Sequence, residues 1–255
     1  MNGVKGLILK EIYLRRKSML AGLAILIPMF ILAVSFCLSF DYGNMKNNEE
    51  LDRDTTAVIL AYTVAGVGII LFGQNAETIV KDKKCKWNIF EHTLPMSAQK
   101  LAAVRIGLLL ASSILGLVVS TLLSWVIFAL SHKEFTLTVF ANISVISMFV
   151  FALMTFANFM NLKYSDPQKA ATRSMAWLFA VYILIAVFVY RKFAELQLQF
   201  SELTEDELNE LLFDEYLTPL AEFRDKLFPF FIFIFAAIAV IGYFLFLTQY
   251  KRREK

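Results

Sequence analysis

The long apolar runs of this chain constrain its fold more than any other feature. Most of them reach the roughly 20 residues that a helix needs to cross a bilayer. The chain is 58% hydrophobic and only 18% charged, whereas about a quarter of the residues in soluble domains are charged. We therefore expect an all-α membrane protein, with residues 1–255 forming a single transmembrane domain of six helices. The expected spans are Met19–Phe40, Ala57–Gly73, Leu101–Leu130, Thr138–Met160, Ala171–Tyr190 and Phe228–Leu247.

The distribution of Lys and Arg predicts the orientation, because the loops on the cytoplasmic side of a membrane are enriched in both residues. Basic residues concentrate before the first span, between the second and third spans, after the fourth span and in the C-terminal tail. The loop after the first span is acidic instead, with Asp41, Glu49 and Glu50. We therefore expect both termini to face the cytoplasm.

Charged residues are missing from the central part of every expected span. Arg105 lies about one turn inside the third span, from where its side chain can extend to the interface. Ion-coupled transporters usually place ionisable residues within the bilayer, so this pattern disfavours them, although backbone carbonyls can also bind an ion. The chain lacks the G-x-x-x-x-G-K-[ST] phosphate-binding loop, and no catalytic constellation or metal-binding motif stands out. We expect no enzymatic activity in this chain.

Neutral polar side chains within the spans have two interpretations. They can form interhelical hydrogen bonds, which contribute roughly 1 kcal/mol or less each, or they can line a cavity for a polar or amphipathic substrate. Small residues at helical spacing, in the pairs Ala61/Ala65 and Gly107/Ala111, fit close helix packing within the chain or across a dimer. The candidate cavity residues are Tyr62, Thr63, Asn142, Ser144 and Asn158.

Residues 4–16 are expected to form an interfacial helix that is attracted to anionic lipid. Val4, Ile8 and Ile12 recur at four-residue spacing, with basic residues between and after them. Membrane lipid is therefore an expected partner of this helix. The same helix can also brace a partner domain.

The stretch from Lys86 to Lys100 predicts a short amphipathic helix across the membrane surface. Trp87, Phe90 and Leu94 share one helical face, and Pro95 ends the helix because the residue before a proline disfavours the α conformation. Ser97 can then cap the next helix. The residues alone leave two roles open: an aromatic anchor at the headgroup level, or a docking site for a soluble partner.

Residues 191–227 form an acidic segment on the opposite side of the membrane. Thr204 and Glu207 make a capping box, and Thr218-Pro219 begins a second helix, so two short amphipathic extracellular helices are expected. Pro229 then bends the entry into the last span. The acidic residues form either a solvated face or a gate at the exit, and the candidate gate residues are Glu205, Asp206, Glu207 and Glu210.

The chain begins with a basic helix, a span, an acidic loop and a second span, followed by W-N-I-F-E-H-T-L-P-M-S. This order resembles permease subunits of type-2 ABC exporters. It is similar in particular to the small bacterial six-span permeases, which include the membrane subunits of phenol-soluble modulin exporters. The opening K-G-L-I-L-K-E-I-Y-L is similar as well. The resemblance covers the whole chain in topology, but its specific motif is short. It implies a coupling helix in a groove of the ATP-binding subunit, made by Trp87, Phe90, Glu91, Leu94 and Pro95.

The resemblance also implies a function and a set of partners. The chain would be a multi-pass permease of the bacterial cytoplasmic membrane, paired with a second permease, identical or paralogous, and with two cytoplasmic ABC ATPase subunits. ATP and Mg would bind in the ATPase, and this chain would hold no cofactor or metal and bind no nucleic acid. The expected cargo is an amphipathic or antimicrobial peptide, with a lipid or drug-like compound as the alternative. A membrane scaffold or sensor that recruits a cytoplasmic partner, and an ion-coupled secondary transporter, remain open.

Overall fold

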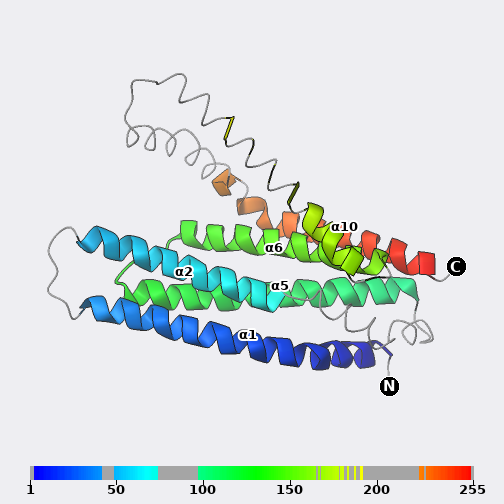
Figure 1. The fold of residues 1–255 in the computed structure, drawn as a ribbon, viewed down its shortest axis with the longest axis horizontal. Coiled ribbons are helices and arrows are strands. Elements are labelled where there is room, and N and C mark those ends of the chain that lie inside the picture. The colour runs from blue at the N-terminus through cyan, green and yellow to red at the C-terminus, as the bar shows by residue number, and fades with distance from the viewer. Residues whose placement is uncertain are drawn as a thin grey trace.

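The computed structural model describes residues 3–41, 49–73, 97–164, 166, 168–177, 179–180, 183, 187, 190–191, 224–226 and 228–253. These residues form helices joined by turns and short extended segments, with no strand among them. The long helices pack side by side, and both chain ends lie at the same end of the bundle (Figure 1). The elements are α1 (Gly3–Asp41), α2 (Glu49–Gly73), α5 (Ala98–Leu130), α6 (Leu137–Lys163), η2 (Phe228–Phe230) and α10 (Phe231–Arg253).

Within the described part of the chain, four helical segments are long and apolar enough to cross a membrane: Met19–Leu38, Ala98–Leu130, Leu137–Lys163 and Arg224–Arg252. They coincide with the first, third, fourth and sixth expected spans. The apolar part of α2, Thr56–Phe72, falls just short of that length. Among the described residues, the prediction of an all-helical chain with helices long and apolar enough to cross a membrane is therefore confirmed.

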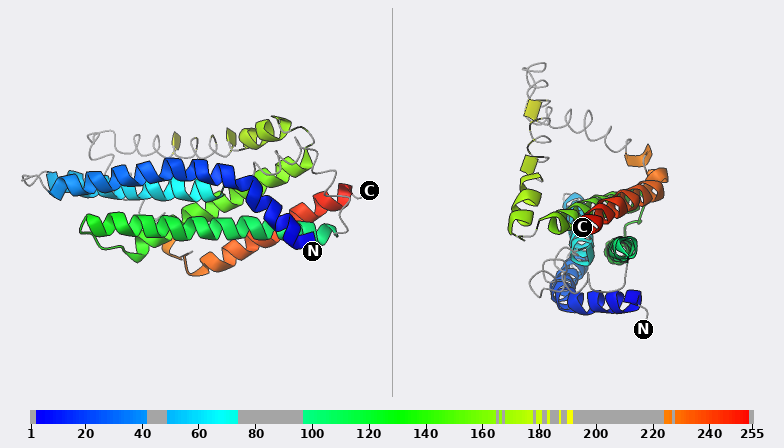
Figure 2. Two further views of the ribbon diagram at one scale, coloured as in Figure 1. Left: turned by 90° about the horizontal axis from the view of Figure 1, so that it is seen from below. Right: turned by 90° about the vertical axis from the view of Figure 1, so that its right-hand side faces the viewer.

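The fifth expected span, Ala171–Tyr190, lies only partly within the described residues. Its described part is helical and exposes apolar side chains such as Met175, Trp177 and Phe179. Residues 168–177 stand to one side of the bundle in both views of Figure 2.

The first helix differs from the sequence expectation. The interfacial helix expected over residues 4–16 and the span expected at Met19–Phe40 form one continuous helix of 39 residues. Nothing ends the helix between them, because residues 14–18 contain no glycine or proline. Figure 2 shows that the N-terminal part of α1 nevertheless turns away from the line of the remainder.

Helix α2 packs most extensively against α5, and small residues make this close approach possible. A Cβ atom added at Gly68 would lie 2.5 Å from Ser120 Oγ, so a larger residue there would displace the Ser120 hydroxyl. Ser120 Oγ donates to the Ala65 carbonyl at 2.9 Å, and Ser124 Oγ donates to the Ala61 carbonyl at 3.1 Å. The Ala61/Ala65 pair therefore packs within the chain, and these two serines form interhelical hydrogen bonds.

Gly107 and Ala111 do not take part in this packing, because both lie on an exposed face of α5.

Another part of the core lies between α5, α6 and α10. There the buried ring of Phe151 stacks on Phe235, with centroids 4.8 Å apart. The 3-10 turn η2 contains Pro229 and leads into α10, at the place where the sequence predicts a bent entry.

Candidate functional site

Two groups of candidate residues lie outside the described part of the chain. They are the coupling-helix residues Trp87, Phe90, Glu91, Leu94 and Pro95, and the gate residues Glu205, Asp206, Glu207 and Glu210. Their roles stay predictions. The described chain resumes at Ser97, which occupies the expected N-cap position of α5 but makes no side-chain capping hydrogen bond. Helix α5 therefore begins directly after the predicted coupling helix.

The five candidate cavity residues differ in the hydrogen bonds that their side chains make. Asn142 Nδ2 donates to the Tyr62 hydroxyl at 2.6 Å, which joins α6 to α2. Thr63 Oγ1 donates to the Ile59 carbonyl and Asn158 Nδ2 donates to the Met154 carbonyl, so both bond within their own helices. Ser144 is fully buried, and its hydroxyl has no hydrogen-bond partner among the described residues.

Arg224 extends the Tyr62–Asn142 pair into a three-residue cluster. Its Nη1 donates to Asn142 Oδ1 at 2.7 Å, and its Nε donates to Asp225 Oδ1 at 2.8 Å. Asn142 thus uses both ends of its amide, and it holds α2, α6 and the residues before η2 together. We call Tyr62, Asn142 and Arg224 the Asn142 cluster. Arg224 was not among the site residues predicted from the sequence, although it is one of the few basic residues in an acidic segment.

Replacing Asn142 with Ala is expected to lower the free energy of unfolding by about 1–3 kcal/mol, because two hydrogen bonds disappear and two polar partners lose their contact. Replacing Tyr62 with Phe removes only one of these bonds and should cost about 0.5–1.5 kcal/mol. Unfolding of the purified chain in detergent measures both values. Thr63→Val serves as the control, since Thr63 is exposed and bonds its own helix. Equal losses in Asn142→Ala and Thr63→Val would contradict the assigned role.

A second polar cluster lies at the end of the bundle where the chain termini meet. Arg105 Nη1 donates to Glu11 Oε1 in an ion pair, and Arg105 Nε donates to the Tyr250 hydroxyl at 3.3 Å. Arg105 is 7% exposed, Glu11 0% and Tyr250 1%. The expectation that Arg105 extends to the interface is therefore wrong, because Glu11 of α1 provides its counter-charge inside the bundle. We call Glu11, Arg105 and Tyr250 the Arg105 cluster.

The local sequence explains how α1 reaches this cluster. Leu7 and Glu11 are four residues apart and share one helical face, and both are buried. Ile12, which belongs to the apolar stripe of the predicted interfacial helix, lies on another side of α1 and is 54% exposed. Because Glu11 stands on the same face as a buried leucine, its carboxylate was a signal that a cation had to lie opposite it. No partner for Glu11 was predicted from the sequence.

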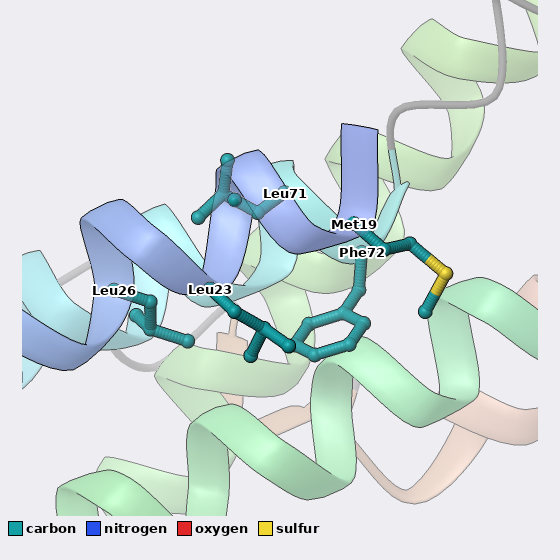
Figure 3. Close-up of a pocket in the computed structure, with 6 residues that line it drawn as sticks. Met19, Leu23, Leu26, Leu71 and Phe72 are labelled. Carbon is teal, nitrogen blue, oxygen red and sulfur yellow. The ribbon is translucent and has the colours of Figure 1, made fainter. Parts of the chain in front are cut away.

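An apolar hollow between α1 and α2 is lined by Met19, Gly22, Leu23, Leu26, Leu71 and Phe72 (Figure 3). None of the residues predicted to line a cavity contributes to it. Its lining offers no charged or hydrogen-bonding side chain, so it has no means of orienting a polar ligand. Among the described residues, no group of His, Cys, Asp and Glu side chains is arranged to hold a metal ion.

Comparison of the chain with protein-family models, with curated proteins and with solved structures found no match.

Proposed function

We propose that this chain is the permease subunit of an ATP-driven type-2 ABC exporter, with six spans and cytoplasmic termini, in a bacterial cytoplasmic membrane. The observation that carries the proposal is the amphipathic segment Trp87–Pro95 directly before α5. Helix α5 begins at the end of the bundle where both termini lie (Figure 1). The predicted coupling helix is thus joined to the end of the bundle that carries the basic N-terminal region and the basic tail.

The direction of the helices supports six spans. Helices α1 and α5 run away from the end that holds the termini, and α2 and α6 return to it (Figure 1). Helix α10 ends there as well. One further crossing, for which Ala171–Tyr190 has the length and the apolar composition, brings the chain to the start of α10. An even number of crossings then leaves both termini on one side, and the positive-inside rule makes that side cytoplasmic.

In this mechanism, ATP binding and the conformational switch would take place in different chains. Two ATPase subunits would bind ATP and Mg and move the coupling helices of two permease chains, which would switch between inward-open and outward-open states. ATP drives such a switch only because the nucleotide-bound ATPase binds one permease state more tightly than the other. The cargo, an amphipathic or antimicrobial peptide or else a lipid or drug-like compound, is proposed from the family resemblance.

Purification of the tagged chain in a mild detergent tests the proposal. We expect a soluble ATPase to copurify in stoichiometric amount, together with ATP hydrolysis. Absence of an ATPase, under conditions that preserve a known ABC exporter complex, would overturn the proposal. A stoichiometric partner without ATPase activity would instead indicate a membrane scaffold or sensor.

An ion-coupled carrier is a second candidate, and the Arg105 cluster favours it. Paired ionisable residues inside a helical bundle are a common feature of ion and proton pathways. Glu11 and Arg105 form such a pair, although Arg105 lies in only the second turn of α5. A carrier of this kind needs no ATPase, so the same purification separates the two candidates.

A further inference from the structure

We infer that the Arg105 cluster is a mechanical joint, which makes the adjoining ends of α1, α5 and α10 move as one unit when the segment Trp87–Pro95 is displaced. Glu11, Arg105 and Tyr250 would then be positioning residues for energy coupling. This inference rests on the proposed function and adds the route by which motion reaches two further helices.

Each of the three helices contributes one member of the cluster. Arg105 of α5 contacts Glu11 of α1 and Tyr250 of α10 through different nitrogen atoms of one planar guanidinium group. A planar group held at two positions fixes orientation as well as distance. Arg105 follows Ala98, the first residue of α5, by about 10 Å along the helix at 1.5 Å per residue. Displacement of the segment before α5 therefore acts on the cluster through only two helical turns.

An apolar layer around the cluster keeps the ion pair strong. The buried side chains of Leu7 from α1, Leu101 and Ala102 from α5, and Phe246 and Leu247 from α10 belong to one hydrophobic cluster with Tyr250. Electrostatic attraction is stronger in such a low-dielectric environment than in water. Moving Arg105 away from Glu11 would separate two buried opposite charges, which is unfavourable although Lys10 Nζ stays 3.9 Å from the Glu11 carboxylate oxygen. The three helix ends therefore resist separation, as a joint requires.

The polar contacts of α5 with α2 are neutral hydrogen bonds, not ion pairs. The α5 serines hold α2 through single neutral hydrogen bonds to backbone carbonyls. Bonds of that kind are individually weaker than an ion pair with shared donors. The Ser120→Ala/Ser124→Ala double variant is therefore a suitable control, because it also removes two buried polar contacts of α5 but leaves the Arg105 cluster intact.

The test uses the chain in complex with its ATPase in lipid nanodiscs. Spin labels replace Tyr13 on α1 and Lys251 on α10, which are both exposed, in a Cys37→Ser/Cys85→Ser background. Pulsed electron paramagnetic resonance gives the distance distribution between the labels, without nucleotide and with ATP and vanadate. The test variant is Glu11→Leu/Arg105→Leu, which removes both charges together and leaves neither of them unpaired.

In the labelled parent chain, we expect the distance distribution to keep its centre and width when ATP and vanadate are added. In Glu11→Leu/Arg105→Leu it should become about twofold wider, because no ion pair holds the helix ends together. Arg105→Lys keeps the charge and should restore the narrow distribution in part, and Ser120→Ala/Ser124→Ala should leave it unchanged. Equal distributions in the parent and the double-leucine variant, with the ATPase bound, would overturn the joint and leave the proposed function standing.

Failure of the proposed function gives a different result. If no ATPase binds the chain, the joint is tested on the isolated chain without nucleotide. The distance distributions of the parent and of Glu11→Leu/Arg105→Leu are then compared. A wider distribution in Glu11→Leu/Arg105→Leu would then support a joint that serves another motion, and equal distributions would overturn it.

Discussion

Replacing Arg105 with Met is expected to lower the free energy of unfolding by about 3 kcal/mol, the lower end of the range for breaking a buried ion pair. Met has a similar volume, so the loss arises from charge rather than from a cavity. Glu11, which is fully buried, would keep its carboxylate without the guanidinium opposite it. Lys10 Nζ lies 3.9 Å from the same carboxylate oxygen and offsets part of this cost. Equilibrium unfolding in mixed detergent micelles measures the loss.

The double variant Glu11→Leu/Arg105→Leu is the control for this prediction. It removes both charges, and replacement of a whole buried ion pair by apolar residues is often neutral for stability. We therefore expect the double variant to recover most of the stability that Arg105→Met loses. A double variant as unstable as the single one would show that packing volume, rather than the unpaired charge, explains the loss.

The same comparison separates stability from mechanical coupling. An apolar joint can be as stable as an ionic one, but it lacks the directional contacts through which one guanidinium orients two neighbouring helices. The double variant should therefore fold well and yet let α1 and α10 move independently. A cluster with a purely structural role would predict no such difference between the two measurements.

Four of the six expected spans coincide with long apolar helices, and they were predictable from the sequence because the length of an apolar run is a local property. The run from Leu101 to Leu130 defines α5 to within three residues of its actual start at Ala98. The pairing of helices is not local. Glu11 and Arg105 are 94 residues apart in sequence, and Tyr62 and Asn142 are 80 apart. Each of these polar residues is visible in the sequence, whereas its partner is set by the packing of whole helices.

The sequence did not reveal which face of α1 packs against the other helices, and the reason is physical. In water, an apolar stripe on a helix marks the buried face. In a membrane, lipid is as apolar as a leucine side chain, so apolar residues face lipid as readily as protein. The regular spacing of Ile8 and Ile12 therefore did not identify the buried face, and Ile12 is 54% exposed. The more informative residue was Glu11, because a carboxylate next to lipid is costly and turns toward a partner.

Replacing Glu91 with Lys is expected to weaken the binding of the ATPase about thirtyfold, which corresponds to about 2 kcal/mol and to the cost of a misplaced charge at an interface. The prediction follows from the proposed role of Trp87–Pro95 as the coupling helix. In the predicted helix, Glu91 would lie beside the aromatic face, so reversing its charge would change the docking surface without removing an apolar contact. Titration of purified ATPase onto the nanodisc-embedded chain gives the dissociation constant, and ATP hydrolysis by the complex should fall in parallel.

Glu134→Lys is the matched control, because Glu134 is an exposed residue in the loop between α5 and α6, at the opposite end of the bundle. It makes the same change in net charge and should leave ATPase binding unchanged. Both variants should unfold at the temperature of the unmodified chain, since neither alters a helix of the described core. A Glu91→Lys chain that binds and stimulates the ATPase normally would remove Glu91 from the coupling site. Equal weakening by both variants would mean that the ATPase responds to net charge rather than to a docked helix.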